Sequence, residues 1–465
     1  MVILSEQKKR VFLTSLGCPK NRVDSEVMLG LLRRRGYELA PSEEEAEVLV
    51  VNTCSFIEAA KEESVDAILE LAGFKQQGAC EKLVVTGCLP QMFRADIENE
   101  LPEVDRFLGT GEFGRIGDVL DELYGADAPG LHQNIPDPEA LFEGYGERLI
   151  TGGASTYLKI AEGCDRSCSF CVIPNLRGPQ RSRPVDVVLD EARRLCEAGA
   201  LEINLIAQDL TSYGEDLPGR PKLSALLKEL ARVDGLRWLR LHYNYPDKFT
   251  DELLEVIASE PTITPYLDIP MQHISDRMLR LMRRGTREKV VRDLIGRLRS
   301  DIPELVLRTT FIVGFPGETQ EEFEQLCDFV SEARFERMGA FTYSREEGTP
   351  AHDLPDQIDE DVKQERLETL MRIQQEFARE HSASLVGKEV DVLVTGEHPE
   401  TEHLLAGRLA TQAPEIDGIV HIASVQSTER DGQIAAMNVE ELAGTIRRAR
   451  ITDADVYDVV AELID

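Results

Sequence analysis

The chain has 465 residues, 42% hydrophobic and 29% charged, a composition typical of a globular protein with room for two to four domains. Asp and Glu outnumber Lys and Arg by 85 to 52, which gives a formal net charge of -33. This charge opposes strong nucleic-acid binding and favours a basic partner. No apolar segment is long enough for a membrane span and the N-terminus lacks a secretory signal, so we expect a cytoplasmic protein with reduced cysteines.

Residues 9–124 alternate short apolar runs, such as "VLVVNTC" and "KLVVTGC", with amphipathic helical patterns. The alternation predicts an α/β domain with a parallel sheet. Cys18, Cys54 and Cys88 each end an apolar run. Because the carboxyl ends of parallel strands meet at one edge of a sheet, we expect these three thiols to form a ligand set there. Taken alone, the same pattern would fit three ordinary core cysteines about equally well.

The rest of the chain divides into four segments. Residues 125–152 are rich in Gly, Pro and Asp, which indicates a linker. Residues 153–383 contain six strand-helix units and predict a full or partial α/β barrel of the TIM type. Residues 384–450 contain short strands separated by turns, which favours a small antiparallel β-barrel. Residues 451–465 are assigned to a C-terminal tail.

A tight cysteine motif lies near the start of the predicted α/β barrel. Cys164, Cys168 and Cys171 have the spacing C-x3-C-x2-C and directly follow a predicted strand, where α/β barrels carry their chemistry. Three thiolates on a four-iron cluster leave one iron without a protein ligand, so that a small molecule can bind it. Zinc is the alternative, but a structural zinc needs a fourth ligand, and neither Cys nor His follows closely.

With Phe170 as its aromatic residue, the motif resembles the signature of the radical S-adenosylmethionine (SAM) superfamily. The whole chain is similar to the methylthiotransferases of that superfamily, in which a cluster domain, a radical SAM core and a TRAM barrel follow in this order. The resemblance implies SAM and two 4Fe-4S clusters, one of them auxiliary and involved in delivering sulfur. The ligands that it implies are Cys18, Cys54 and Cys88 for the auxiliary cluster, and Cys164, Cys168 and Cys171 for the radical SAM cluster.

Further residues at predicted strand ends are candidates for the SAM pocket. A tight turn alone would also explain the glycines among them. Asp209 is as readily a helix cap, and no catalytic residue is assigned, His273 included. The SAM candidates are Phe170, Gln208, Gln272, Gly314 and Gly317.

The three arginines that follow the cysteine motif could bind a carboxylate, although solvated surface arginines are the preferred interpretation. They are Arg177, Arg181 and Arg183. The three remaining cysteines, Cys80, Cys196 and Cys327, are expected to be structural.

Two motifs and a charge balance bear on the substrate. "GCPKN" at 17–21 and "APEIDG" at 413–418 resemble the methylthiotransferases that modify the β-carbon of an aspartate in small-subunit ribosomal protein number twelve, whereas tRNA enzymes typically read more like "GCQMN". Residues 384–465 hold sixteen acidic and six basic residues, a balance that repels phosphate and attracts a basic protein.

We therefore expect a basic ribosomal protein as substrate, together with an electron donor and a sulfur source. The alternative within the family is a tRNA adenosine methylthiotransferase. An iron-sulfur carrier without catalysis is the alternative from another class, but it would leave the predicted α/β barrel and the terminal barrel without a task.

Overall fold

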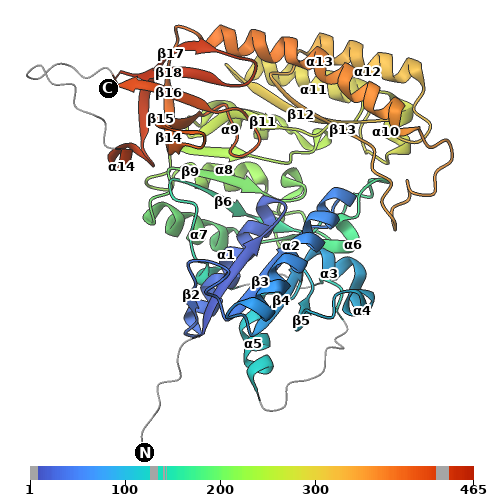
Figure 1. Ribbon diagram of the computed structural model, residues 1–465. Coiled ribbons are helices and arrows are strands. Elements are labelled where there is room, and N and C mark those ends of the chain that lie inside the picture. Colours follow the sequence, from blue (N-terminus) through green and yellow to red (C-terminus); the bar gives the residue numbers. More distant parts are fainter. Residues whose placement is uncertain (1–8, 126–134, 140–141, 143, 426–438, 465) are drawn as a thin grey trace, which may run out of the picture.

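The computed structural model describes residues 9–125, 135–139, 142, 144–425 and 439–464. In Figure 1 the N-terminal unit, in blue, lies below the central unit, and the C-terminal barrel, in red, lies above it. Within the described residues, no helix is both long enough and apolar enough to cross a membrane.

The N-terminal unit is a five-stranded sheet with all strands parallel, in the order β2-β1-β3-β4-β5. The predicted parallel-sheet domain is thus confirmed. Strand β3 is buried along its whole length, as its continuous apolar sequence requires. The strands are β1 (Arg10–Ser15), β2 (Glu38–Leu39), β3 (Val48–Thr53), β4 (Lys82–Gly87) and β5 (Arg106–Leu108). The helices are α1 (Pro19–Arg34), α2 (Glu58–Gln77), α3 (Cys88–Phe93), α4 (Ile97–Glu100) and α5 (Ile116–Tyr124).

The central unit is a sheet of six parallel strands in the order β13-β12-β11-β10-β9-β6, which leaves two open edges. This arrangement confirms a partial barrel. Its strands are β6 (Ser155–Lys159), β9 (Glu202–Ile206), β10 (Trp238–Leu241), β11 (Ile263–Asp268), β12 (Val306–Val313) and β13 (Arg337–Thr342). Its helices are α6 (Ile173–Arg177), α7 (Val185–Glu197), α8 (Leu223–Leu230), α9 (Asp251–Ser259), α10 (Asp276–Leu281), α11 (Glu288–Asp301), α12 (Gln320–Ala333) and α13 (Glu360–Leu385).

The C-terminal unit is a closed five-stranded barrel with the order β14-β15-β16-β18-β17. Its ladders are antiparallel except that between β16 and β18, which is parallel. Residues 451–465 were assigned to a tail, but those described complete the barrel, because alternate residues of β18 are buried in its core. The elements are β14 (Glu389–His398), β15 (Thr401–Leu409), β16 (Val420–Val425), α14 (Val439–Leu442), β17 (Ile446–Ala454) and β18 (Val459–Leu463).

Buried contacts join the three units. Tyr157 of β6 and Ile206 of β9 belong to the same apolar cluster as the core of the N-terminal unit. Part of the predicted linker lies outside the described residues, but its end packs at this junction, where buried Arg148 pairs with Glu26 of α1 and Glu191 of α7. The N-terminal sheet is therefore fixed against the β6 side of the central unit.

Candidate active site

The first cysteine set lies at the carboxyl edge of the N-terminal sheet, as the strand pattern predicts. Cys54 follows β3, Cys88 follows β4, and these strands pair up to Thr53 and Gly87. A methyl group on Gly17, which has φ +84°, would lie 2.7 Å from the Cβ atom of Cys54. Glycine is therefore required for Cys18, the next residue, to approach Cys54.

Two of these thiols, Cys54 and Cys88, are buried, whereas Cys18 is partly exposed. Burial raises the pKa of Cys88 to about 12; Arg177 opposes the rise, and the charges of Cys54 and Cys18 add to it. A bound metal removes the proton from a coordinating thiol, so such thiols become charged when the cation arrives.

The second cysteine set lies in a loop framed by the short hairpin of β7 (Ala161–Glu162) and β8 (Arg181–Ser182). Each sulfur atom has a donor nearby. The backbone N–H of Arg166 donates to Cys164 Sγ at 3.4 Å, that of Ile173 to Cys171 Sγ at 3.5 Å. Arg284 Nη1 lies 3.6 Å from Cys168 Sγ. Hydrogen-bond donors that point at the sulfur ligands tune the reduction potential of an iron-sulfur cluster.

In the part of the chain that the structure describes, no three His, Cys, Asp or Glu side chains converge as ligands of a single metal ion. A four-iron cluster binds each thiolate to a different iron, so its ligands stand farther apart than those of one zinc ion. Three separated thiols with donors around them suit such a cluster in both sets.

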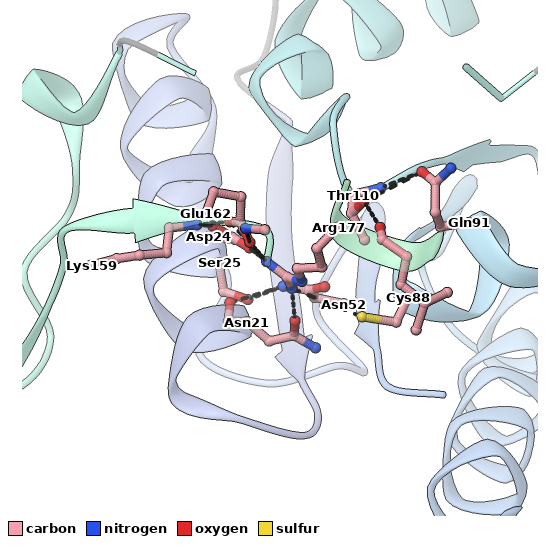
Figure 2. Close-up of polar contacts among 12 residues, drawn as sticks. Asn21, Asp24, Ser25, Asn52, Cys88, Gln91, Thr110, Lys159, Glu162 and Arg177 are labelled. Atoms are coloured by element: carbon pink, nitrogen blue, oxygen red, sulfur yellow. Dashed lines mark hydrogen bonds and ion pairs between the residues drawn. The ribbon is translucent and has the colours of Figure 1, made fainter. Parts of the chain in front are cut away.

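A buried ionic network joins the two cysteine sets (Figure 2). Arg177, which lies six residues after Cys171, is 2% exposed and has one guanidinium nitrogen 3.9 Å from Cys88 Sγ. Its other nitrogen donates to Asp24 and to Glu162, at 3.0 Å each. Both carboxylates also bind the buried ammonium of Lys159. One connected set of charges thus extends from the first cysteine set to the hairpin that frames the second.

The three arginines after the second cysteine set are not the solvated surface residues that the sequence favoured. Arg177 and Arg183 are buried, and Arg183 donates to Glu191, so both bind carboxylates of this chain instead of solvent. Arg181 is half-buried and donates to the backbone carbonyl of Arg177 at 2.9 Å. The interpretation as solvated arginines is wrong because each has a partner within the chain: carboxylates for Arg177 and Arg183, and a backbone carbonyl for Arg181.

The SAM candidates lie along the carboxyl ends of the central strands. Gln208 follows β9 and donates to Glu162 at 2.8 Å, while its carbonyl oxygen is buried without a partner. The side-chain oxygen of Gln272, after β11, is buried and unpartnered too. Two orphaned acceptors at this edge suit a polar ligand with N–H groups, such as the amino groups of SAM. Their role in SAM binding stays a prediction.

The other SAM candidates have contacts within the chain. Phe170 packs against an apolar cluster that includes Phe315. Gly314, with φ +70°, is approached by the side chain of Lys363, which a Cβ atom would meet at 2.3 Å. Packing is therefore a sufficient reason for glycine at 314. A Cβ atom on Gly317, which has φ +78°, would meet only the end of the Arg277 side chain, at the ordinary contact distance of 3.8 Å, so the positive φ is the reason for glycine there.

Both ring nitrogens of His273 have partners within the chain, so no acid-base role is assigned to it. Its Nδ1 atom accepts two backbone N–H groups, and its Nε2 atom lies 2.9 Å from Glu318. It fixes the loop after β11.

A cavity of about 650 Å³ lies beside the second cysteine loop, and Arg166, Asp209 and Lys248 are among the residues that line it. Asp209 accepts from Arg166 at 2.8 Å and from two hydroxyl groups. None of the five SAM candidates lines this cavity, although Asp209 directly follows Gln208 after β9.

The three other cysteines pack in apolar surroundings. Cys80 precedes β4 and so lies at the opposite end of that strand from Cys88. Cys196 and Cys327 pack against the core of the central unit.

The sequence motifs do not single out four residues of this region: Lys20, Asp24, Lys159 and Glu162. A charge at a buried position of an apolar pattern is the signal that could have found Lys159 and Asp24, which are 0% and 3% exposed.

The "APEIDG" loop connects the terminal barrel to the rest of the site. Glu415 accepts a hydrogen bond from Arg22 of α1 at 2.6 Å, although its side chain is 59% exposed. Asp417 accepts from the backbone of Ala413, which is buried against Tyr266 of β11. The loop therefore fixes the barrel against both other units.

The fold and the two cysteine sets define a radical SAM enzyme with a second iron-sulfur domain. Residues 10–109 match the uncharacterized protein family UPF0004, residues 158–330 the radical SAM superfamily and residues 386–464 the TRAM domain. The ribosomal protein uS12 methylthiotransferase RimO of Anaeromyxobacter sp. is 53% identical over 98% of this chain and 93% of its own length. That of Geobacter sulfurreducens is 50% identical over 99% of this chain and 100% of its own. The chain belongs to the RimO family of methylthiotransferases.

Solved structures share the fold over part of the chain at low identity. The radical S-adenosylmethionine methyltransferase TsrM of Kitasatospora setae aligns with a TM-score of 0.56 and 16% identity, covering 74% of this chain and 77% of that one. This likeness concerns the fold.

Proposed function

We propose that this enzyme methylthiolates the β-carbon of an aspartate in the small-subunit ribosomal protein uS12, as the names of its relatives indicate. The product carries a methylthio group in place of one hydrogen of that carbon. When bound, the two 4Fe-4S clusters and SAM supply hydrogen abstraction, sulfur and the methyl group. A substrate that is part of the ribosome places the enzyme in the cytoplasm, with an electron donor and a sulfur source as further partners.

The observation that carries this proposal is the contact of Arg177 with Cys88. Arg177 belongs to the element that follows the second cysteine set, and Cys88 belongs to the first set. Two functions, hydrogen removal and sulfur transfer, must act on one carbon, so their sites have to adjoin. We infer that Cys18, Cys54 and Cys88 hold the auxiliary cluster and that Cys164, Cys168 and Cys171 hold the other.

The chain's own groups set the environment of these sites. Arg177 and Arg284 place positive charge next to Cys88 and Cys168, which stabilises thiolates. The orphaned oxygens of Gln208 and Gln272, which follow β9 and β11, can accept hydrogen bonds from a bound amine.

The tRNA alternative is not favoured. The relatives reported above are named as ribosomal protein enzymes, and the acidic balance of residues 384–465 is opposite to what phosphate binding needs. A carrier without catalysis is not favoured either, because residues 158–330 match the radical SAM superfamily.

The test is an anaerobic reaction of the reconstituted enzyme with SAM, a reductant and either purified uS12 or total tRNA. We expect the mass increase of one methylthio group on an aspartate of uS12 and none on tRNA. An increase on tRNA adenosine with uS12 unchanged would replace the proposal by its alternative.

A further inference from the structure

Lys20 is a buried cation without a salt-bridge partner among the described residues. It lies in the first turn of α1, two residues after Cys18, and is 6% exposed. Its ammonium nitrogen lies 3.1 Å from the centre of the Tyr243 ring, a cation–π contact. A buried charge that only a ring contacts costs free energy, because a neutral ring replaces little of the lost hydration.

The neighbouring buried cations are neutralised, which makes Lys20 the exception among them. Lys159 binds Asp24 and Glu162, and Arg177 binds the same two carboxylates. Arg308 binds Asp268 at 2.8 Å.

The carboxylates that influence Lys20 at longer range are already occupied. One is Glu162, which accepts hydrogen bonds from Lys159, Arg177 and Gln208. The other is Asp268, which accepts from Arg308 and from the backbone N–H of Tyr243. The Cys18 thiol, a proposed cluster ligand, has the largest charge interaction with Lys20, and both carboxylates bind other cations. Among the described residues the ammonium therefore has no carboxylate partner of its own and can bind an anion from outside the chain.

The position of Lys20 connects the two halves of the site. Its backbone belongs to the N-terminal unit beside Cys18, whereas Tyr243 follows β10 at the carboxyl edge of the central sheet. An anion that binds Lys20 would thus be placed between the first cysteine set and the mouth of the partial barrel.

We propose that Lys20 binds the side-chain carboxylate of the substrate aspartate, an inference that rests on the proposed function. The carboxylate carbon of aspartate is bonded directly to the β-carbon. An ion pair between that carboxylate and Lys20 therefore also holds the reacting β-carbon in place. Tyr243 positions the ammonium by its ring face. Lys20 is therefore a specificity-determining residue, which selects aspartate over the uncharged asparagine of similar shape.

The experiment measures binding of reconstituted enzyme to two forms of uS12, the natural protein and a variant with asparagine at the modified aspartate. A charge-assisted hydrogen bond stabilises a complex by about 1.5–3 kcal/mol, so the natural enzyme should bind the aspartate form about 10- to 100-fold more tightly. Lys20→Met should bind both forms equally, and Lys20→Arg should restore part of the difference. Lys75→Met, which changes a lysine paired with Asp105 on the outside of the same unit, should keep the full discrimination.

Iron content and substrate-free SAM cleavage are measured on every variant. Both should be unchanged in Lys20→Met. If Lys20→Met keeps the preference for aspartate, or if it loses iron or SAM cleavage, Lys20 does not act through the substrate carboxylate. If the natural enzyme cleaves SAM but never modifies uS12, the proposed function itself fails, and this outcome is distinct from the other two.

Discussion

Arg177 shows how a single residue can belong to two functional groups. It is surrounded by charges whose effects oppose one another: burial lowers its pKa, but Glu162, Cys88 and Asp24 outweigh burial, so the pKa is raised. The guanidinium stays charged beside a cysteine sulfur. A positive donor next to a thiolate ligand makes the reduced, more negative state of a cluster easier to reach.

Arg177→Met should therefore lower the reduction potential of the auxiliary cluster. Loss of one charged hydrogen bond corresponds to a shift on the order of 50–100 mV for a one-electron couple. Arg177→Lys, which keeps the charge, should shift the potential less. The measurement is a potentiometric titration followed by electron paramagnetic resonance. An unchanged potential in Arg177→Met would show that the guanidinium serves only to pair Asp24 and Glu162.

The cysteine assignment is tested by iron content. Two sets of three thiolates should bind close to eight irons after reconstitution. Replacing Cys164, Cys168 and Cys171 together by Ala should remove about half the iron and all cleavage of SAM. The corresponding variant of Cys18, Cys54 and Cys88 should still cleave SAM but not transfer the methylthio group. Cys196→Ala is the control and should behave like the natural enzyme; 5'-deoxyadenosine formed by the first triple variant would refute the assignment.

At the scale of elements, the parts that could be predicted from the sequence are those encoded locally. The runs that end at Cys54 and Cys88 are strands with the carboxyl ends at one edge, because apolar runs between helices have few other solutions. Pairings between distant residues could not be predicted. Arg177 and Asp24 are 153 positions apart, so nothing local showed that they are buried together. The prediction of a tail from residue 451 is wrong because this boundary falls inside β17. Strand β18 also pairs in parallel with β16, which lies far back in the chain, and no local pattern shows such a pairing.

Strand β15 is tied to strand β9 by Arg408, which binds Glu202. Burial raises the pKa of Glu202, but Arg240 and Arg408 outweigh this effect and lower the pKa from 4.5 to about 2. Because the pKa of Glu202 is lower in the folded state, its ion pairs stabilise the fold fully above about pH 4.5. This stabilisation disappears as the pH falls toward 2. Arg408→Met should lower the free energy of unfolding at pH 7 by about 3 kcal/mol.

The measurement is urea denaturation at pH 7 and at several values below pH 4.5. The difference between natural protein and Arg408→Met should narrow as the pH falls. Arg450→Met is a matched control, because Arg450 pairs with Glu389 at 2.7 Å on the exposed side of the same barrel. Arg450→Met should lower the free energy of unfolding at pH 7 by less than about 1 kcal/mol. Equal losses in the two variants would mean that Arg408 does not stabilise the junction.

At the scale of the whole molecule, the acidic charge is expected to guide a basic ribosomal protein to the enzyme. Glu415 is unsuitable for testing this, because it also holds Arg22. Glu397 and Glu400 are exposed on the terminal barrel. Changing both to Lys should raise the KM for uS12 several-fold at low salt, and less at physiological salt, where the Debye length is about 8 Å.

The same variant should leave substrate-free SAM cleavage unchanged. Its control carries the same charge reversals at Glu63 and Glu70 on α2, which are exposed residues of the N-terminal unit. If both variants raise the KM equally, net charge and not the barrel guides the encounter. Tighter binding of tRNA by the barrel variant, with tRNA methylthiolation by the natural enzyme, would argue for the alternative substrate.

The buried network around Asp24 also has a consequence for biosynthesis. Asp24 is translated 135 residues before Lys159 and 153 before Arg177, the cations that bind it. Glu26 is translated 122 residues before Arg148, and until then, among the described residues, only Arg22, at 3.8 Å on the same helix, is near it. Until then, the inner face of α1 carries carboxylates that favour contact with water. The nascent N-terminal sheet is therefore expected to close only after the second cysteine loop has been translated, so that iron-sulfur assembly at the first cysteine set follows translation of the second.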